Sequence, residues 1–320
     1  MLCTMLFSTA VPAVVGLAVL QNALPVLHPT RAIIIPGFLT GSRDFEGMAA
    51  ALRARGVDAL VLPLPAWAWV PCLGGRSMRP VLERIEHAVR HACALETLQE
   101  GVPAIEYGPA DLWHDFWTNP GGVRAVGGSA EPDEYPLVEP RGRYPPAGPP
   151  RGTVALVGHS AGGWIARLFL SSRSYGGKSY CGAALVHSLV TLGTPHGEGS
   201  GPAFRGVAWA RREPVPVRAL AVGADGTPGG SSGAFTKNAY AFCTQDGDGA
   251  KLDGDGVTPI SSALDLDGAE RLVIPGACHF DFARLGLIVP ELAAACREGK
   301  QWYGSDSVVA DWAPWLHQVD

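Results

Sequence analysis

The sequence predicts an α/β fold with a mostly parallel, doubly wound sheet and flanking helices. Two observations predict it. Short apolar runs alternate along the chain with longer amphipathic stretches, and short links join most of them. One apolar run, 154–157, continues through a glycine-rich turn into a helix-like stretch at 163–170. Because 320 residues can bury one large core, we expect a single domain over 29–320.

The spacing of apolar residues places the elements of the first half. Residues 32–35 are a β-branched run that ends at Pro-Gly, which is typical of a buried central strand. Residues 44–55 have apolar side chains at helical spacing and are followed by a glycine. We expect the next strand at 57–64 and a long amphipathic helix at 78–98.

Three further apolar runs predict strands in the second half. They cover 183–192, 217–222 and 271–274, and each is followed by a segment rich in glycine and polar residues. These loops would meet at one edge of a parallel sheet.

The insertion at about 101–152 breaks this order, because proline, glycine and aromatic residues replace core periodicity there. Such a length suits either a disordered insertion or a cap over the site. Its three large aromatics, Trp113, Phe116 and Trp117, favour a packed role.

Residues 1–28 are apolar and carry no Lys, Arg, Asp or Glu. They fit a signal or anchor, the remainder of an organelle-targeting peptide, or a buried N-terminal element. The positive start of a secretory signal is missing, and Pro12 and Asn22 interrupt the run. Membrane association, or placement in an organelle such as a plastid, is expected over plain cytosol.

Composition excludes some function classes. The net charge of −5 is spread without basic blocks, so nucleic acid is not expected as a partner. The seven cysteines form no C-x-x-C pair, so neither a zinc site nor a thioredoxin-like motif is predicted. One disulfide stays possible, and the odd count leaves at least one thiol unpaired within a monomer. No cofactor or metal is expected.

Ser160 is the candidate nucleophile. It stands in Gly-His-Ser-Ala-Gly between a predicted strand and a predicted helix, which is the pattern of a nucleophile elbow. Such a turn strains the serine backbone and tolerates only small residues two positions away on either side. A second match, Gly-Gly-Ser-Ser-Gly at 229–233, follows turn-forming residues, and no apolar helix is predicted after it, so we interpret it as a flexible loop.

A nucleophilic serine needs a base and an acid that orients the base, and in a hydrolase sheet of this type both follow the serine. Asp255 is the candidate acid because it directly precedes Gly-Val-Thr-Pro, whereas Asp253 could cap the turn. Alternatives are a solvated Asp-Gly turn or a calcium loop, although the acidic spacing does not fit a twelve-residue calcium loop.

Position in the chain selects the base among nine histidines. His196 and His279 follow the serine outside any strand, and only His279 also follows the acid. A structural histidine is the alternative for His279. The others precede or include the elbow (His28, His87, His91, His114, His159), lie in a strand (His187) or lie in the C-terminal tail (His317).

Two backbone amides are expected to stabilise the oxyanion of an acyl-transfer reaction. The amide of Ala161 follows the nucleophile. The second should come from the loop after the strand at 32–35, where Phe38 is the best candidate. An ordinary strand-to-helix turn is the plain alternative there.

With these motifs the chain resembles the α/β-hydrolase lipases and esterases, in particular their plant and algal branch. The matching segments are 33–38, 158–164, 192–196 and 254–259, with His279, and the resemblance covers about 31–285. It implies an α/β-hydrolase fold and a triad of Ser160, Asp255 and His279. Pro36 departs from the histidine found in many lipases, and the insertion has no clear counterpart.

The expected function is a metal-independent serine hydrolase that cleaves carboxylic esters, with acyl lipids as the expected class. Trp67, Trp69, Trp164 and Phe204, with the aromatics of the insertion, could line an apolar pocket, although most aromatics in any chain are core. An acyltransferase or thioesterase is an alternative, as is a non-catalytic lipid-binding protein of the same fold.

Overall fold

The computed structural model describes residues 30–95, 97–101, 153–176, 178–245, 247–281 and 301–317. The apolar segment 1–28 and nearly all of the insertion at 101–152 lie outside these ranges. Within the described ranges, no helix is both long and apolar enough to span a membrane. Membrane association and organelle placement stay predictions.

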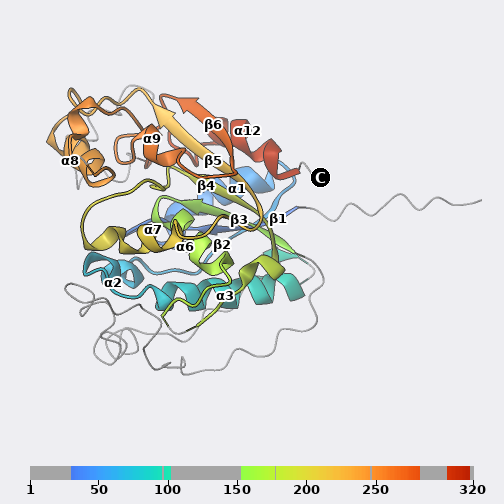
Figure 1. Cartoon of the computed structure of the whole chain (residues 1–320). Coiled ribbons are helices and arrows are strands. Elements are labelled where there is room, and N and C mark those ends of the chain that lie inside the picture. Colours follow the sequence, from blue (N-terminus) through green and yellow to red (C-terminus); the bar gives the residue numbers. More distant parts are fainter. Residues whose placement is uncertain are drawn as a thin grey trace, which may run out of the picture.

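The described residues form a six-stranded parallel sheet in the order β2-β1-β3-β4-β5-β6 (Figure 1). The chain passes from β1 outward to β2 and then returns to place β3 on the other side of β1. This order confirms the predicted fold class, a doubly wound parallel sheet of the α/β-hydrolase type. The strands are β1 (Arg31–Ile35), β2 (Asp58–Val61), β3 (Val154–His159), β4 (Val186–Leu192), β5 (Arg218–Asp225) and β6 (Glu270–Pro275).

Helices connect the strands. They are α1 (Glu46–Arg53), α2 (Val70–Leu73), α3 (Arg79–Ala94), α6 (Ala161–Leu170), α7 (Arg205–Ala210), α8 (Ala234–Phe242), α9 (Ile260–Ala263) and α12 (Asp306–Trp312). Short 3-10 helices occupy Ser42–Phe45, Ala66–Trp69, Leu98–Glu100, Gly182–Ala184, Pro202–Phe204, Gly249–Lys251 and Ala313–His317.

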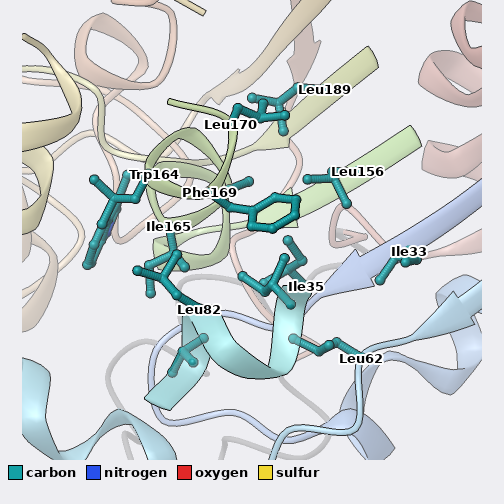
Figure 2. Close-up of a cluster of buried hydrophobic side chains, with 14 of the residues drawn as sticks. Ile33, Ile35, Leu62, Leu82, Leu156, Trp164, Ile165, Phe169, Leu170 and Leu189 are labelled. Atoms are coloured by element: carbon teal, nitrogen blue, oxygen red, sulfur yellow. The ribbon is translucent and has the colours of Figure 1, made fainter. Parts of the chain in front are cut away.

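Side chains alternate between the two faces of each strand and so form two hydrophobic layers, one on each face of the sheet. In β1, Ile33 and Ile35 pack toward α3 and α6, whereas Ala32 and Ile34 pack toward α1 and α12. Figure 2 shows the first layer, with side chains of α6 between the strands and α3. Burial on both faces explains why the central strands β1 and β3 are continuous apolar runs.

Several element boundaries differ from the predictions. The predicted helix at 78–98 ends at Ala94, because Leu95 is already extended. The predicted strand at 57–64 is shorter, since pairing with β1 covers only Asp58–Val61. The first residues of 183–192 form a 3-10 turn before β4.

Five helices of the described structure were not predicted: α2, α7, α8, α9 and α12. Helix α8 follows the loop 229–233, where no apolar helix was predicted; Thr236 and Tyr240 are buried on it, while Phe242 is exposed. Helix α12 buries Val308, Val309 and Trp312 beneath the sheet.

Phe169→Ala is expected to lower the free energy of unfolding by about 3–5 kcal/mol, because Phe169 lies in the layer between α6 and the sheet and is 1% exposed. The matched control is Phe242→Ala, whose ring is 57% exposed and should cost less than about 0.5 kcal/mol. Urea denaturation measures both, and equal effects would contradict this packing.

Candidate active site

Ser160 lies directly after β3, at the point where the chain switches sides of the sheet. Loops after β1 and β3 run apart at such a point and leave a crevice at the carboxyl edge of the sheet. The backbone of Ser160 has φ 51° and ψ −125°, a conformation that non-glycine residues rarely adopt. Its amide donates to the carbonyl of Leu192 at 2.8 Å, which ties the turn to β4.

The glycines around Ser160 are required by close backbone contacts. A Cβ on Gly158 would lie 2.5 Å from Cα of Gly163, and a Cβ on Gly162 would lie 2.4 Å from the carbonyl oxygen of Ile35. The spacing that predicted the elbow therefore reflects a crossing of strand and helix with no room for side chains.

Asp255 is brought to the site by a loop that returns to the end of β5. The amide of Thr227 donates to the carbonyl of Gly254 at 3.2 Å, and that of Gly229 donates to the carbonyl of Leu252 at 2.8 Å. The returning chain places Asp255 at the carboxyl edge of the sheet, where its side chain is completely buried.

Asp253 has a different position. Its carboxylate accepts hydrogen bonds from the amides of Gly226 at 3.1 Å and Gly254 at 2.8 Å. It therefore caps the turn, as the alternative interpretation proposed. No group of three or more His, Cys, Asp or Glu side chains suited to a metal ion occurs among the described residues.

His279 follows β6 and contacts Asp255 twice. Its Nδ1 lies 2.7 Å from Oδ2 of Asp255, and its backbone amide donates to the carbonyl of Asp255 at 3.0 Å. Since an ionised carboxylate can only accept, Nδ1 is the donor in this contact, which leaves Nε2 as the nitrogen that can act as a base. The geometry is that of a base oriented by an acid.

Nε2 of His279 is buried and has no hydrogen-bond partner among the described residues. Ser160, which is 8% exposed, makes no direct hydrogen bond to it within the described structure. Bonds between nucleophile and base are often long without substrate and shorten in the reacting complex.

His196 lies in a different environment. A guanidinium nitrogen of Arg167 donates to its Nδ1 at 3.1 Å, and its Nε2 lies 3.1 Å from the hydroxyl of Thr191. Burial, and then the charges of Arg167 and Arg211, lower the pKa of His196 well below its ordinary value. Both ring nitrogens serve internal contacts, so His196 is a structural histidine.

His159 contacts the backbone of His279, which the sequence did not predict. Its Nε2 donates to the carbonyl of His279 at 2.8 Å, and the two ring centroids are 4.7 Å apart. Burial, and then the neighbouring His279, lower the pKa of His159 well below its ordinary value. The ring of His159 is therefore neutral, and its hydrogen bond ties the backbone of His279 to the elbow that carries Ser160.

The two predicted oxyanion donors stand at the right elements. Ala161 begins α6 directly after Ser160, and the loop with Phe38 packs on the elbow, since a Cβ on Gly37 would lie 2.8 Å from Cβ of Ser160. Among the described residues, no hydrogen-bond acceptor pairs with the amide of Phe38 or of Ala161. Their role as oxyanion donors stays a prediction.

The four described aromatic residues that were predicted to line a pocket lie in the core or pack against it. Trp69 and Trp164 are buried in the layer between the sheet and α3, and Trp67 and Phe204 pack against that layer. The remaining three, Trp113, Phe116 and Trp117, lie outside the described residues. Five cysteines in the described part are unbridged: Cys72, Cys93, Cys181, Cys243 and Cys278.

Comparison with known proteins gives limited similarity. No family model matches the chain, and no curated protein does. Among solved structures, RedJ with a PEG molecule bound in its active site is similar at 16% identity and a TM-score of 0.32, covering 85% of this chain and 88% of RedJ. CarC, a serine hydrolase involved in carbazole degradation, is similar at 17% identity and a TM-score of 0.30, covering 83% of this chain and 88% of CarC. Because both scores are low, the fold assignment depends on the sheet order and the elbow, not on these two structures.

Proposed function

We propose that this protein is a serine hydrolase that cleaves carboxylic esters through an acyl-enzyme intermediate. One observation carries the proposal. A strained serine at the end of a central strand, with φ 51°, shares the sheet edge with a buried His279–Asp255 pair 2.7 Å apart. Backbone strain at a non-glycine residue persists only where the surrounding structure maintains it, and such residues concentrate at active sites.

In this proposal Oγ of Ser160 attacks the ester carbonyl carbon while Nε2 of His279 takes its proton. The oxyanion that forms accepts hydrogen bonds from the amides of Phe38 and Ala161. The bond between carbonyl carbon and alkoxy oxygen then breaks, and His279 returns the proton to the leaving alcohol. Water, activated by His279, hydrolyses the acyl-serine ester and releases the acid.

An apolar acyl group is the proposed substrate feature, which makes lipase or esterase activity the specific form of the proposal. Leu39, next to the proposed oxyanion donor Phe38, is 53% exposed. The ring of Phe38 packs edge-on to Trp69, whose neighbour Val70 is 48% exposed. Exposed apolar side chains beside the site support binding of a hydrocarbon chain.

The direct test is labelling of the purified protein with a fluorophosphonate, followed by peptide mass spectrometry, and hydrolysis of p-nitrophenyl esters from acetyl to palmitoyl. We expect one adduct, on Ser160, and faster cleavage of long-chain than acetyl esters. The serines of the loop 229–233 serve as internal control and should stay unlabelled.

The outcomes separate the alternatives. A preference for acetyl esters would refute the apolar acyl group but not the serine mechanism. Transfer of the acyl group to an added alcohol, faster than to water, would indicate an acyltransferase. Absence of both label and turnover would favour a binding protein of the same fold.

A further inference from the structure

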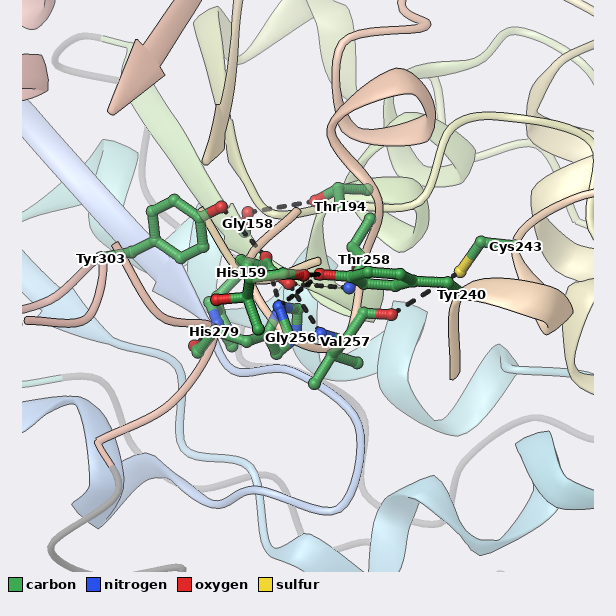
Figure 3. Close-up of polar contacts among 12 residues, drawn as sticks. Gly158, His159, Thr194, Tyr240, Cys243, Gly256, Val257, Thr258, His279 and Tyr303 are labelled. Carbon is green, nitrogen blue, oxygen red and sulfur yellow. Dashed lines mark hydrogen bonds and ion pairs between the residues drawn. The ribbon is translucent and has the colours of Figure 1, made fainter. Parts of the chain in front are cut away.

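Four donors contact the buried carboxylate of Asp255. Its Oδ1 accepts from the amides of Val257 at 2.9 Å and Thr258 at 2.7 Å. Its Oδ2 accepts from Nδ1 of His279 at 2.7 Å and from the phenol of Tyr303 at 3.0 Å (Figure 3). Tyr303 and His279 therefore share one oxygen.

The phenol of Tyr303 is held in place independently of the acid loop. Two residues before Tyr303, the carbonyl of Gln301 accepts a hydrogen bond from the amide of Cys278 at 2.8 Å. The indole of Trp312, on α12, donates to the carbonyl of Tyr303 at 3.1 Å. The side chain of Tyr303 is completely buried, so its hydroxyl has no access to water as another hydrogen-bond partner in place of Asp255.

We propose that Tyr303 is a positioning residue, which restrains Asp255 and sets how strongly this carboxylate attracts the proton of His279. The inference rests on the proposed function, since it gives Tyr303 a role in the same site. A hydrogen bond from the phenol disperses the negative charge on Oδ2. Without it, more of that charge acts on His279, the imidazolium is favoured, and less neutral base is present near pH 7.

The groups that face this pair do not obscure the effect. The pKa of Tyr303 is raised well above its ordinary value, mainly by burial and secondly by the charge of Asp255. The pKa of His159 is lowered, mainly by burial and secondly by His279. Burial, with a smaller contribution from Asp255, raises the pKa of Cys243 to about 12. Tyr240 and Cys278 also face the site, and burial and then Asp255 raise the pKa of Tyr240. The shifts of Tyr303, Tyr240, Cys243 and His159 all favour the neutral form of these groups around pH 7, so a pH change there reports on Asp255 and His279.

The experiment compares the full-length parent with Tyr303→Phe, which removes only the hydroxyl. The matched control is Tyr180→Phe, because Tyr180 is also a buried tyrosine, and its hydroxyl donates to the buried carboxylate of Glu83 on α3 at 2.9 Å. Proton uptake by His279 is followed by NMR on protein labelled with ¹⁵N-histidine, and kcat/KM is measured against pH.

In Tyr303→Phe we expect His279 to take up its proton at a pH higher by about half a unit to one unit. The acid limb of kcat/KM should move by the same amount, with KM changed less than kcat. Tyr180→Phe should lower Tm similarly and leave both pH curves in place.

A parent-like titration in Tyr303→Phe, with only a Tm loss equal to that of Tyr180→Phe, would overturn the inference. The NMR readout does not need turnover, so failure of the proposed function is distinguishable. A shifted titration in a protein without esterase activity would support the coupling through Asp255 and refute the hydrolase proposal.

Discussion

Ser160→Ala is expected to reduce kcat for the best ester by at least about 10⁴-fold, and adding His279→Gln is expected to reduce it no further. The two residues act as one unit in the proposed mechanism, since the base has no proton to take once the hydroxyl is removed. Glutamine can still donate to Asp255 from its amide, but it offers no basic nitrogen. The single variants and the double variant should therefore have similar residual rates, measured with the same p-nitrophenyl ester.

The control for this series is Ser231→Ala, in the loop that repeats the glycine-serine pattern. Ser231 is exposed and lies beyond β5 without a strained backbone, so its removal should leave kcat unchanged. Tm values of all variants test folding. If Ser160→Ala and His279→Gln lost activity in an additive way, two independent functions would be indicated, and the proposed unit would be wrong.

Local patterns were sufficient to predict the strands and the elbow. The run at 32–35 and the glycines at 158 and 162 predict structure from steric rules that act over a few residues, and the structure has β1 and the turn there. The order of Ser160, Asp255 and His279 also follows from the chain, because loops at one edge of a parallel sheet meet. The structure brings Asp255 and His279 into contact, while their catalytic role stays a proposal.

Contacts between distant segments could not be predicted in this way. Tyr303 reaches Asp255 across 48 residues, and no local pattern marks a tyrosine as a donor to a carboxylate. Helix α12 does carry a local signal, since Val308, Val309 and Trp312 recur at helical spacing after Ser305. His159 also makes a contact that no local pattern marks, because its bond to the carbonyl of His279 joins residues 120 positions apart.

Gly193→Ala is expected to lower both activity and stability strongly, because Gly193 has φ 56° and lies directly against the acid and the base. A Cβ there would be 2.5 Å from Oδ2 of Asp255, 2.7 Å from the ring of Tyr303 and 3.1 Å from Nδ1 of His279. The methyl group would therefore push into the oxygen that His279 and Tyr303 share. We expect the free energy of unfolding to fall by about 2–5 kcal/mol, from backbone strain and overpacking together.

Gly268→Ala separates these two causes. Gly268 has a similar backbone, with φ 75°, but no atom lies within 4 Å of an added Cβ, so only the strain of about 1–2 kcal/mol applies there. Urea denaturation should show that Gly193→Ala is destabilised more than Gly268→Ala. Only Gly193→Ala should lower kcat/KM, by at least about 100-fold, because displacement of the base by a fraction of an ångström misaligns proton transfer. Equal stability losses with activity retained in both variants would mean that Asp255 and His279 do not meet beside Gly193. The acid and base would then have to be sought among other side chains at this edge of the sheet.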